Sequence, residues 1–583
     1  MRLFHCRWCL SAVLGLGLIW PAAAQTPVAE GRYLVYLRDK AGSPFSVGRP
    51  EAFLSPQSLR RRARQSIPVR ARDLPVNPAY LARVRAAAGP AGQVHYASRW
   101  LNAVLLSGDA AALNRVRALP EVVSAEQLSV RPATANQAGR GATGTQAAPD
   151  FARHSEPAPR AAFSPIRFSQ QGGQMAPAGS SSSREVYGKT FAQNELLGVG
   201  VMHEAGFRGE GIRIAVFDAG FPGVGSGNAF AALRTAGRLA GTRNFVDGGR
   251  QVDLRDSHGT NCLSTMAAEL PGFFVGTAPR ATYYLCLTED AISERPVEEA
   301  NWLAAAEYAD SAGVDIISSS LGYTAFQEPF RSYTYADLNG RTALSTRAAV
   351  EAARVGMLVV TSAGNEGNSA WRYISAPADA DSIISVAAVD SLGRKASFSS
   401  FGPTADGRLA PTLAAQGVAT AILTASGTAR RSNGTSFACP SLAGLAAGFW
   451  QANPQLSAQQ VIGFLTRSAS QALAPDNELG SGIPNFAAAQ ALAGVPVERP
   501  EIYPNPGDGS GTWRLRLPPA YRGLPARVRV FDARGRLVRE LALPATPGPE
   551  RPLPLGTLAG GLYLCQVSDV AGQPARAVRF AQP

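Results

Sequence analysis

Lysine is almost missing from this sequence. Among the 56 basic residues of the 583-residue chain, only Lys40, Lys189 and Lys395 are lysines, and the rest are arginines scattered along the chain. The net charge of +13 is therefore spread along the sequence. Nucleic-acid-binding proteins typically have a basic block interleaved with aromatic residues, and this sequence has none. We expect no nucleic-acid partner and interpret the arginine excess mainly as compositional bias. An anionic surface or lipid stays open as a partner.

Histidine and cysteine are also scarce. The five histidines include no His-Glu-x-x-His pattern, which argues against a histidine-rich metal site. Six cysteines are present, but no Cys-x-x-Cys pair follows the first 24 residues, so a cysteine zinc site is not expected. Cys262 and Cys286 are the one candidate disulfide pair. The alternative is that they, Cys439 and Cys565 are all buried free thiols.

No apolar run is long enough to cross a bilayer, so we expect no transmembrane segment. The apolar stretch from Leu10 to Trp20 is short, follows Arg2 and Arg7, and precedes a row of three alanines that ends at Ala24. This arrangement is typical of a secretory signal, which we assign to residues 1–24. We therefore predict an exported protein, secreted or at the cell surface.

The region after the signal divides in two. Residues 25–130 alternate strand and helix patterns: strands near 33–37 and 100–106, helices near 78–88 and 111–119, and a short strand from Val122. This small α+β unit suits either an inhibitory prosegment or an ordinary binding domain. Residues 131–186 are rich in Ala, Gly, Ser, Gln and Pro, which predicts a disordered linker. Its arginines are possible cleavage points: Arg140, Arg153, Arg160, Arg167 and Arg184.

Residues 187–495 carry short, nearly continuous apolar runs separated by helical patterns. This alternation predicts an α/β domain with a doubly wound, mostly parallel sheet, whose functional residues collect at the carboxyl ends of the strands. The expected strands cover 212–217, 281–287, 314–319, 357–361 and 383–389, and the expected helices cover 301–311 and 342–355.

Four polar residues stand at such positions, in the order Asp218, His258, Asn365 and Ser436. Ser436 precedes an Ala/Gly-rich helix with Pro440 expected in its first turn, where backbone N–H groups can hold an oxyanion. On its own, such a serine is more often a helix cap than a nucleophile. His258, flanked by glycine and threonine, is the favoured base, because His203 is expected on an exposed helix face.

These motifs resemble those of the subtilisin-like (S8) serine peptidases. Ile214–Gly220 is similar to the family's strand-plus-aspartate motif, His258-Gly259-Thr260 to its histidine motif, and Gly434–Pro440 to its serine motif. Two departures are visible: Ala219 follows the aspartate where the family usually has Thr or Ser, and Asn261-Cys262-Leu263 replaces Val-Ala-Gly.

The resemblance implies a serine endopeptidase made as a precursor, with protein or peptide substrates and its own prosegment as inhibitor. It implies a catalytic triad of Asp218, His258 and Ser436, with Asn365 as the oxyanion donor. Asp256 is a fallback partner for the histidine, although it is too close to His258 in the sequence to approach the far ring nitrogen easily. No cofactor is expected for catalysis, and a structural calcium ion is conceivable at 337–340. The implied substrate-binding residues are Ser320, Leu321, Gly322, Ser362, Ala363 and Gly364, with 375–377 beside them.

Residues 496–583 change to alternating strand patterns near 513–517, 528–531, 560–564 and 577–580, with a turn at 532–535, which predicts a small β-sandwich. The Tyr503-Pro-Asn-Pro opening and the strand at Gly561-Leu562-Tyr563 resemble the C-terminal sorting domains of type IX secretion. Export through the outer membrane by that machinery is the expectation, and an accessory binding module is the alternative. For the whole chain, the alternatives are a catalytically silent binding protein that keeps the fold, and an esterase. The missing Gly-x-Ser-x-Gly elbow and the order of the residues argue against the esterase.

Overall fold

The computed structural model describes residues 30–131, 186–493, 501–503, 513–517, 525–545, 550–569 and 576–582. The predicted signal at 1–24, nearly all of the predicted linker at 131–186 and the Pro-Asn-Pro opening of the tail lie outside the described residues. None of the helices in the described ranges combines the length and apolar character needed to cross a bilayer.

The N-terminal unit, residues 30–131, is a four-stranded antiparallel sheet in the order β2-β3-β1-β4. Helices α2 and α3 pack on one face of this sheet around Val35, Val84 and Val116. The predicted helices are confirmed, but the second predicted strand starts three residues late, because Trp100 lies in the preceding turn. The elements are β1 (Glu30–Leu37), α1 (Pro56–Arg64), α2 (Pro78–Ala88), β2 (Gln93–Ser98), β3 (Ala103–Gly108), α3 (Ala110–Arg117) and β4 (Val122–Arg131).

The central domain is built on a seven-stranded sheet in the order β13-β12-β11-β10-β5-β9-β6, and every neighbouring pair is parallel. The inner strands are buried along nearly their whole length, as both faces are covered. The predicted parallel α/β class is thus confirmed. The strands are β5 (Arg213–Asp218), β6 (Leu239–Asn244), β9 (Thr282–Leu287), β10 (Ile316–Ser319), β11 (Leu358–Ser362), β12 (Ile384–Val389) and β13 (Leu413–Gln416).

Helices form a layer on each face of this sheet. On one face, the largest hydrophobic core joins the sheet to α6, α8, α11, α12 and α13; on the other, α9 and α10 pack around Phe217 and Trp302. The edge-to-face contact between these two rings has a centroid distance of 5.2 Å. The helices are α5 (Phe191–Leu196), α6 (Val199–Glu204), α7 (Ala231–Thr235), α8 (His258–Ala267), α9 (Val297–Ala312), α10 (Leu344–Arg354), α11 (Thr435–Ala452), α12 (Ala458–Arg467) and α13 (Phe486–Ala493).

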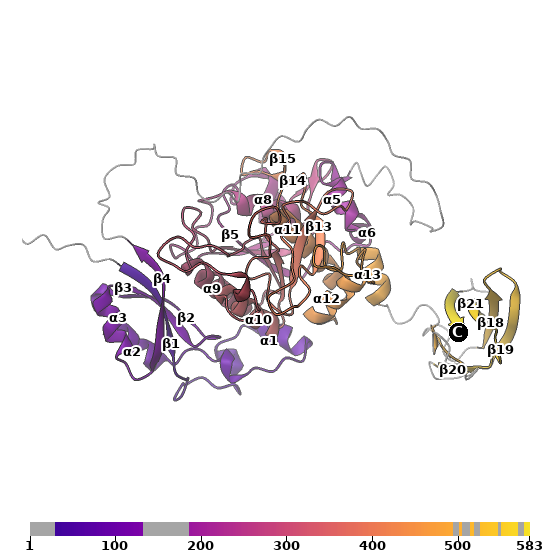
Figure 1. Cartoon of the computed structure of the whole chain (residues 1–583), viewed down its shortest axis with the longest axis horizontal. Helices are drawn as coiled ribbons and strands as arrows, with labels where there is room; N and C mark the ends of the chain where they lie inside the picture. The colour runs from indigo at the N-terminus through magenta and orange to yellow at the C-terminus, as the bar shows by residue number, and fades with distance from the viewer. Residues whose placement is uncertain are drawn as a thin grey trace, which may run out of the picture.

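The free face of the N-terminal sheet packs against α9 and α10. Leu34, Trp100, Leu105 and Leu128 belong to the same hydrophobic core as these two helices. In Figure 1 the indigo and violet N-terminal unit lies against this side of the central domain, with α1 beside α10. The N-terminal unit therefore adds a further layer to the α/β/α arrangement.

Two small antiparallel pairs border the central domain, β7 (Glu269–Leu270) with β8 (Phe274–Val275), and β14 (Thr420–Leu423) with β15 (Ala429–Ser432). The C-terminal segment forms two further sheets, β16-β17-β20 and β19-β18-β21-β22, which share one core around Trp513 and Phe580. This agrees with the predicted β-rich tail. Its strands are β16 (Glu501–Tyr503), β17 (Trp513–Arg516), β18 (Ala526–Asp532), β19 (Leu537–Leu543), β20 (Glu550–Leu553), β21 (Gly561–Asp569) and β22 (Arg576–Gln582).

Two predictions about single residues were wrong. His203 is buried, because its ring nitrogens bond to the Tyr187 hydroxyl at 2.8 Å and to the Thr277 carbonyl oxygen at 3.0 Å. Burial lowers the pKa of His203 to about 4, so this ring is neutral near pH 7. Cys262 and Cys286 are unpaired thiols in separate hydrophobic clusters. Cys286 faces α9 from the sheet, whereas Cys262 lies on α8 over the opposite face.

Candidate active site

The candidate site lies at the carboxyl edge of the parallel sheet. Asp218 is the last residue of β5, which runs between β10 and β9, and its side chain is fully buried. Ser319 ends the neighbouring strand β10, and Ser362 ends β11 one strand further on. The strand ends thus bring Asp218, Ser320 and Ser362 to the same edge.

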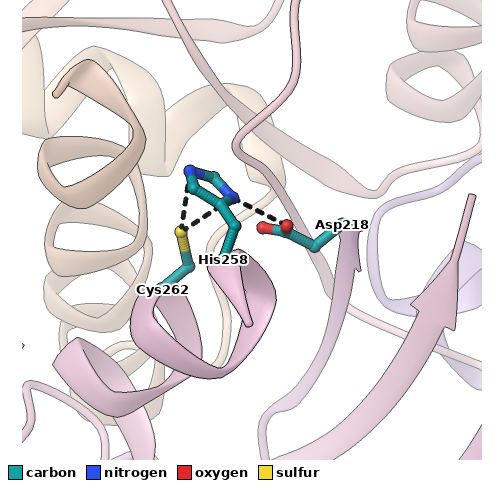
Figure 2. Close-up of side chains that lie close together, drawn as sticks. All are labelled: Asp218, His258 and Cys262. Atoms are coloured by element: carbon teal, nitrogen blue, oxygen red, sulfur yellow. Dashed lines mark hydrogen bonds and ion pairs between the residues drawn. The ribbon is translucent and has the colours of Figure 1, made fainter. Parts of the chain in front are cut away.

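His258 is the first residue of α8 and lies beside Asp218. Its Nδ1 is 2.7 Å from Asp218 Oδ1, and the same oxygen accepts the N–H of Ala219 at 2.8 Å. Figure 2 shows the imidazole between the carboxylate of Asp218 and the thiol of Cys262. Asp256, the fallback partner, instead accepts the backbone N–H of His258 at 2.7 Å and so caps the start of α8.

The pKa of His258 is raised well above its ordinary value. Burial alone would lower this pKa, but the Asp218 carboxylate stabilises the positive ring and outweighs burial. Because Asp218 Oδ1 faces Nδ1, the carboxylate favours the tautomer with its proton on Nδ1, which leaves Nε2 free to accept a proton.

Cys262 lies one helical turn after His258. Its sulfur is 3.7 Å from Nδ1 and 3.8 Å from Nε2 of the ring, and 3.3 Å from the carbonyl oxygen of Ser436. Burial raises the pKa of this thiol, so it stays protonated at neutral pH. The ligand-type atoms of Asp218, His258 and Cys262 lie within 4.8 Å of one another.

Ser436 is the second residue of α11, and the helix begins directly after Gly434. Gly434 has φ 150° and ψ 144°, a conformation open essentially to glycine alone. Pro440 falls inside the helix and not in its first turn as predicted. Proline has no N–H, so the Ser436 carbonyl lacks its usual helical partner. It accepts instead from Ser320 Oγ at 2.8 Å and from the Cys262 thiol.

The hydroxyl of Ser436 points at another backbone oxygen. Its Oγ lies 3.4 Å from the carbonyl oxygen of Ser320, and within the described residues no hydrogen bond joins it to His258. The two residues nevertheless lie close together, because the Cys262 thiol contacts both the His258 ring and the Ser436 backbone carbonyl, and the ring of Phe437 lies 5.9 Å from that of His258. Long or absent contacts between such groups are common in structures without substrate.

Asn365 approaches the same helix start from the loop after β11. Its Oδ1 accepts both the N–H and the hydroxyl of Thr435 at 2.9 Å. The amide oxygen is thereby engaged next to Ser436, and Nδ2 is the end of the side chain that remains to donate. Gly364, with φ 111°, lets the chain turn here, because a Cβ at this position would lie 2.9 Å from Ser400 Oγ.

The three segments predicted to bind substrate lie together. Ser362 Oγ donates to the Leu321 carbonyl at 3.3 Å, and the N–H of Ser375 donates to the Ala363 carbonyl at 3.1 Å. Tyr323, directly after Gly322, exchanges two backbone bonds with Ala376. Ser375 Oγ is buried between Gly322 and Gly364 and has no partner among the described residues.

The loop suggested for calcium, residues 337–340, is a hydrogen-bonded turn. Asp337 Oδ2 accepts from Thr334 and from the Arg331 guanidinium at 2.7 Å, and Asn339 Oδ1 accepts from the N–H groups of Arg341 and Thr342. One carboxylate oxygen of Asp337 and the amide oxygen of Asn339 are thus already hydrogen-bonded within this turn.

Sequence reasoning did not foresee the contacts of Cys262 and Ser320 with Ser436. A signal for Cys262 was present, since residues four apart on a helix lie on one face and His258 begins α8. Nothing in the sequence indicated that Ser320 Oγ would bond to the carbonyl left open by Pro440.

Family models, sequence relatives and solved structures that are similar to this chain are known. The model of the subtilase family, Peptidase S8, matches residues 209–482, and that of the Peptidase S8 propeptide domain of Bacteroidota matches residues 32–142. Subtilisin DY of Bacillus licheniformis is 31% identical over 286 residues, which covers 49% of this chain and 92% of that protein. Subtilisin E of Bacillus subtilis (strain 168) is 31% identical over 309 residues, covering 51% and 72%. The crystal structure of MycP1 from the ESX-1 type VII secretion system is 22% identical, covers 51% of this chain and 85% of that one, and has a TM-score of 0.40.

Proposed function

This chain belongs to the subtilase family of serine peptidases, and from that premise we propose that Asp218, His258 and Ser436 are its catalytic triad. The family and the propeptide domain make it a serine peptidase that is synthesised as a precursor. The observation that carries the residue assignment is the 2.7 Å contact between His258 Nδ1 and Asp218 Oδ1, beside the start of the helix that holds Ser436.

In the proposed mechanism Ser436 Oγ attacks the carbonyl carbon of a peptide bond. His258 Nε2 takes the hydroxyl proton as the new C–O bond forms, and then gives it to the leaving amine as the C–N bond breaks. Asp218 holds the ring in the required tautomer and stabilises its positive form. A water molecule, deprotonated by the same histidine, releases the acyl group and restores the hydroxyl. Because the pKa of His258 is raised, its ring becomes protonated at a higher pH than an ordinary histidine. Activity should fall as the pH drops below this pKa, since the protonated ring cannot act as the base.

Asn365 Nδ2 and the N–H of Ser436 are the proposed donors to the developing oxyanion. The two hydrogen bonds that Thr435 donates to the amide oxygen of Asn365 support this role, because they leave the Nδ2 end of the amide as the donor. In subtilisin itself, losing the asparagine donor lowers turnover about 10²–10³-fold. Residues 320–322, 362–364 and 375–377 are proposed to bind the substrate chain, with protein or peptide as substrate class.

The decisive experiment compares the full-length wild type with Ser436→Ala. We expect the variant to lose hydrolysis of casein and of small peptides, to stay unprocessed, and to lose labelling by a fluorophosphonate. The matched control is Ser441→Ala, since Ser441 lies on the same helix and, among the described residues, its hydroxyl bonds to the Phe437 carbonyl. Persistent casein hydrolysis by Ser436→Ala would refute the assignment. An unlabelled wild-type Ser436 would instead favour a silent binding protein that keeps the fold.

We also propose that residues 1–24 direct export and that residues 496–583 address the protein to type IX secretion, across the outer membrane to the medium or cell surface. The separate hydrophobic core of the C-terminal sheets supports a self-contained module. A variant that lacks residues 496–583 should stay inside the outer membrane in cell fractionation. If this shortened variant still reaches the outside of the cell normally, residues 496–583 are an accessory module and not an export signal.

A further inference from the structure

A cavity lies at the junction between the N-terminal unit and the central domain. Its volume is about 460 Å³, within the range of small-molecule sites. Seven of its lining residues lie between Arg62, near the end of α1, and Asp73. The other two, Arg354 and Val355, lie at the end of α10. The lining is Arg62, Ser66, Ile67, Pro68, Arg70, Arg72, Asp73, Arg354 and Val355, and none of the proposed catalytic residues is among them.

The lining is strongly basic. Four arginines face the cavity with a single carboxylate, Asp73. Asp73 is itself occupied, since Oδ1 accepts from Arg62 at 3.1 Å and Oδ2 accepts the N–H of Arg70 at 2.8 Å. Glu351, behind the lining, accepts from Arg72 at 2.5 and 2.7 Å and from Arg354 at 2.7 Å. Guanidinium groups therefore still outnumber carboxylates around this space.

Arg62 has an unused donor in this environment. Its side chain is 2% exposed and Nη2 bonds to Asp73 and to Asp310 Oδ2 at 2.8 Å, but Nε is buried without a partner among the described residues. A buried donor of a charged group that stays unpaired is unfavourable, and Arg62 is one of the residues that line the cavity.

We propose that this cavity binds a multiply charged oxyanion, a phosphate or sulfate group, held by arginines of both parts of the precursor. Guanidinium forks match the geometry of such groups, and Arg62, Arg70, Arg72 and Arg354 together carry more N–H donors than Asp73, Asp310 and Glu351 accept from them. Because Arg354 belongs to the central domain and the other three arginines to the N-terminal unit, the complete set of donors exists only when both parts are together.

This arrangement couples anion binding to the association of the prosegment with the central domain. A ligand that binds only the assembled form stabilises it in proportion to RT ln(1 + [L]/Kd), so the anion would slow release of the prosegment. The regulatory consequence rests on the proposed peptidase function, but the binding itself does not. The test therefore uses the Ser436→Ala precursor, in which binding is read without any catalysis.

The experiment titrates this precursor with sodium phosphate, sodium sulfate or glycerol 3-phosphate, each against sodium chloride at equal ionic strength. Thermal unfolding and titration calorimetry are the readouts. We expect a saturable rise in the unfolding temperature with the oxyanions but not with chloride. Stronger binding of glycerol 3-phosphate than of inorganic phosphate would identify a phosphate ester as the better ligand, and either order supports the site.

Two variants locate the binding. Arg70→Gln and Arg354→Gln change exposed arginines of the lining, one in each part, and each should weaken phosphate binding at least about fivefold. Arg60→Gln, on the exposed side of α1 and outside the lining, should bind as the parent does. Equal responses to phosphate and chloride, or unchanged phosphate affinity in both lining variants, would overturn the proposal. Loss of hydrolysis in other variants has no bearing on this result.

Discussion

At the scale of single residues, the carboxylate of Asp218 is only half used. Oδ1 accepts from His258 and from the N–H of Ala219, whereas Oδ2 is buried without a partner in the described part of the chain. Similar peptidases usually carry a hydroxyl at the position of Ala219. Ala219 has no side-chain donor that could bond to this oxygen.

We predict that Ala219→Ser raises turnover. A hydroxyl bonded to the carboxylate would hold its orientation, and a hydrogen bond to a charged group contributes about 1.5–3 kcal/mol, of which we expect only part to reach the transition state. The expected gain in kcat is roughly three- to tenfold, measured on a peptide anilide. Ala219→Val, which fills space without a donor, is the control and should not gain. A gain in both variants would mean that packing, not the hydrogen bond, is limiting.

Ser375 makes a second prediction at this scale. Its buried hydroxyl lies between Gly322 and Gly364, within the segments proposed to bind substrate. Ser375→Gly should open space in this region. It should therefore raise kcat/KM for substrates with a large aromatic residue just before the cleaved bond, compared with substrates that have alanine there. A change of about tenfold in this ratio is typical for a small change in pocket volume. Ser375→Ala keeps most of the volume and should change the ratio little; an unchanged ratio in the glycine variant would place the pocket elsewhere.

At the scale of helices and strands, α9 is the element that holds the N-terminal unit. Asp310 of α9 is fully buried and accepts from Ser58 Oγ, Arg61, Arg62 and Arg99 of that unit. On the same helix, Glu307 accepts from Ser98 Oγ at 2.5 Å and from the N–H of Arg99 at 2.9 Å. Three guanidinium groups therefore share the Asp310 carboxylate, and of these three Arg62 also pairs with Asp73.

We predict that Asp310→Asn destabilises the Ser436→Ala precursor strongly. Removing one partner of a buried ion pair typically costs about 3–5 kcal/mol, because the other charges stay buried. Asp381→Asn, at an exposed position, is the control. Denaturant unfolding of both variants measures the difference, and equal stability would show that these contacts are dispensable.

The pKa of Asp310 sets the pH range of this contact. Burial opposes its ionisation, but the guanidinium groups of Arg61, Arg99 and Arg62 lower the pKa to about 2. A lowered folded pKa gives stability that is present above the unfolded value, about 3.9, and is lost as the pH falls towards 2. The Asp310→Asn variant should therefore show less loss of stability than its parent between pH 4 and pH 2.

The segment after β9 has the opposite pH dependence. Glu289 accepts from the hydroxyls of Tyr323 and Thr288, and burial raises its pKa to about 8. The unfolded chain releases this proton near pH 4.5 and the folded chain only near pH 8, so stability declines between these values. Glu289→Gln should flatten that decline and raise the unfolding temperature at pH 9 more than at pH 5. An equal shift at both pH values would remove Glu289 as the cause.

At the scale of the whole molecule, the N-terminal unit and the central domain share one hydrophobic core. Leu34, Trp100 and Leu105 pack with α9 and α10, and Arg295 Nη1 bonds to the Val130 carbonyl at the end of β4 at 3.2 Å. The attachment of the two parts thus rests on packing as well as on the covalent connection through 131–186.

We therefore predict that cutting the connection does not separate the parts. A recognition site for an added specific peptidase, placed within 131–186 of the Ser436→Ala precursor, allows the cut without self-processing. Both pieces should then elute together in size-exclusion chromatography at micromolar concentration. Combining the cut with Asp310→Asn should release the N-terminal piece, and separation without that substitution would contradict the shared core as the main attachment.

Local patterns predicted much of this molecule because they do not depend on distant parts of the chain. The buried strands β5, β9, β10, β11 and β12 were expected from their apolar runs, and Asp218, His258, Asn365 and Ser436 from the turns that follow or precede such elements. The failures concern burial and pairing: His203 was expected to be exposed, and Cys262 was paired with Cys286. The burial of His203 and the separation of the two cysteines both depend on which face of the sheet a helix covers. The pattern of residues along the sequence does not show this.

By itself, the sequence determined which residues stand at the strand ends and helix starts, since backbone propensity, glycine and proline act within a few positions. Only the tertiary structure decided how those residues are used. It placed Ser320 Oγ against the carbonyl that Pro440 leaves open, Cys262 beneath the imidazole, and three arginines of the N-terminal unit on Asp310. The physical reason is that charges and unpaired polar groups find partners through space, once packing of the two units has fixed their distances.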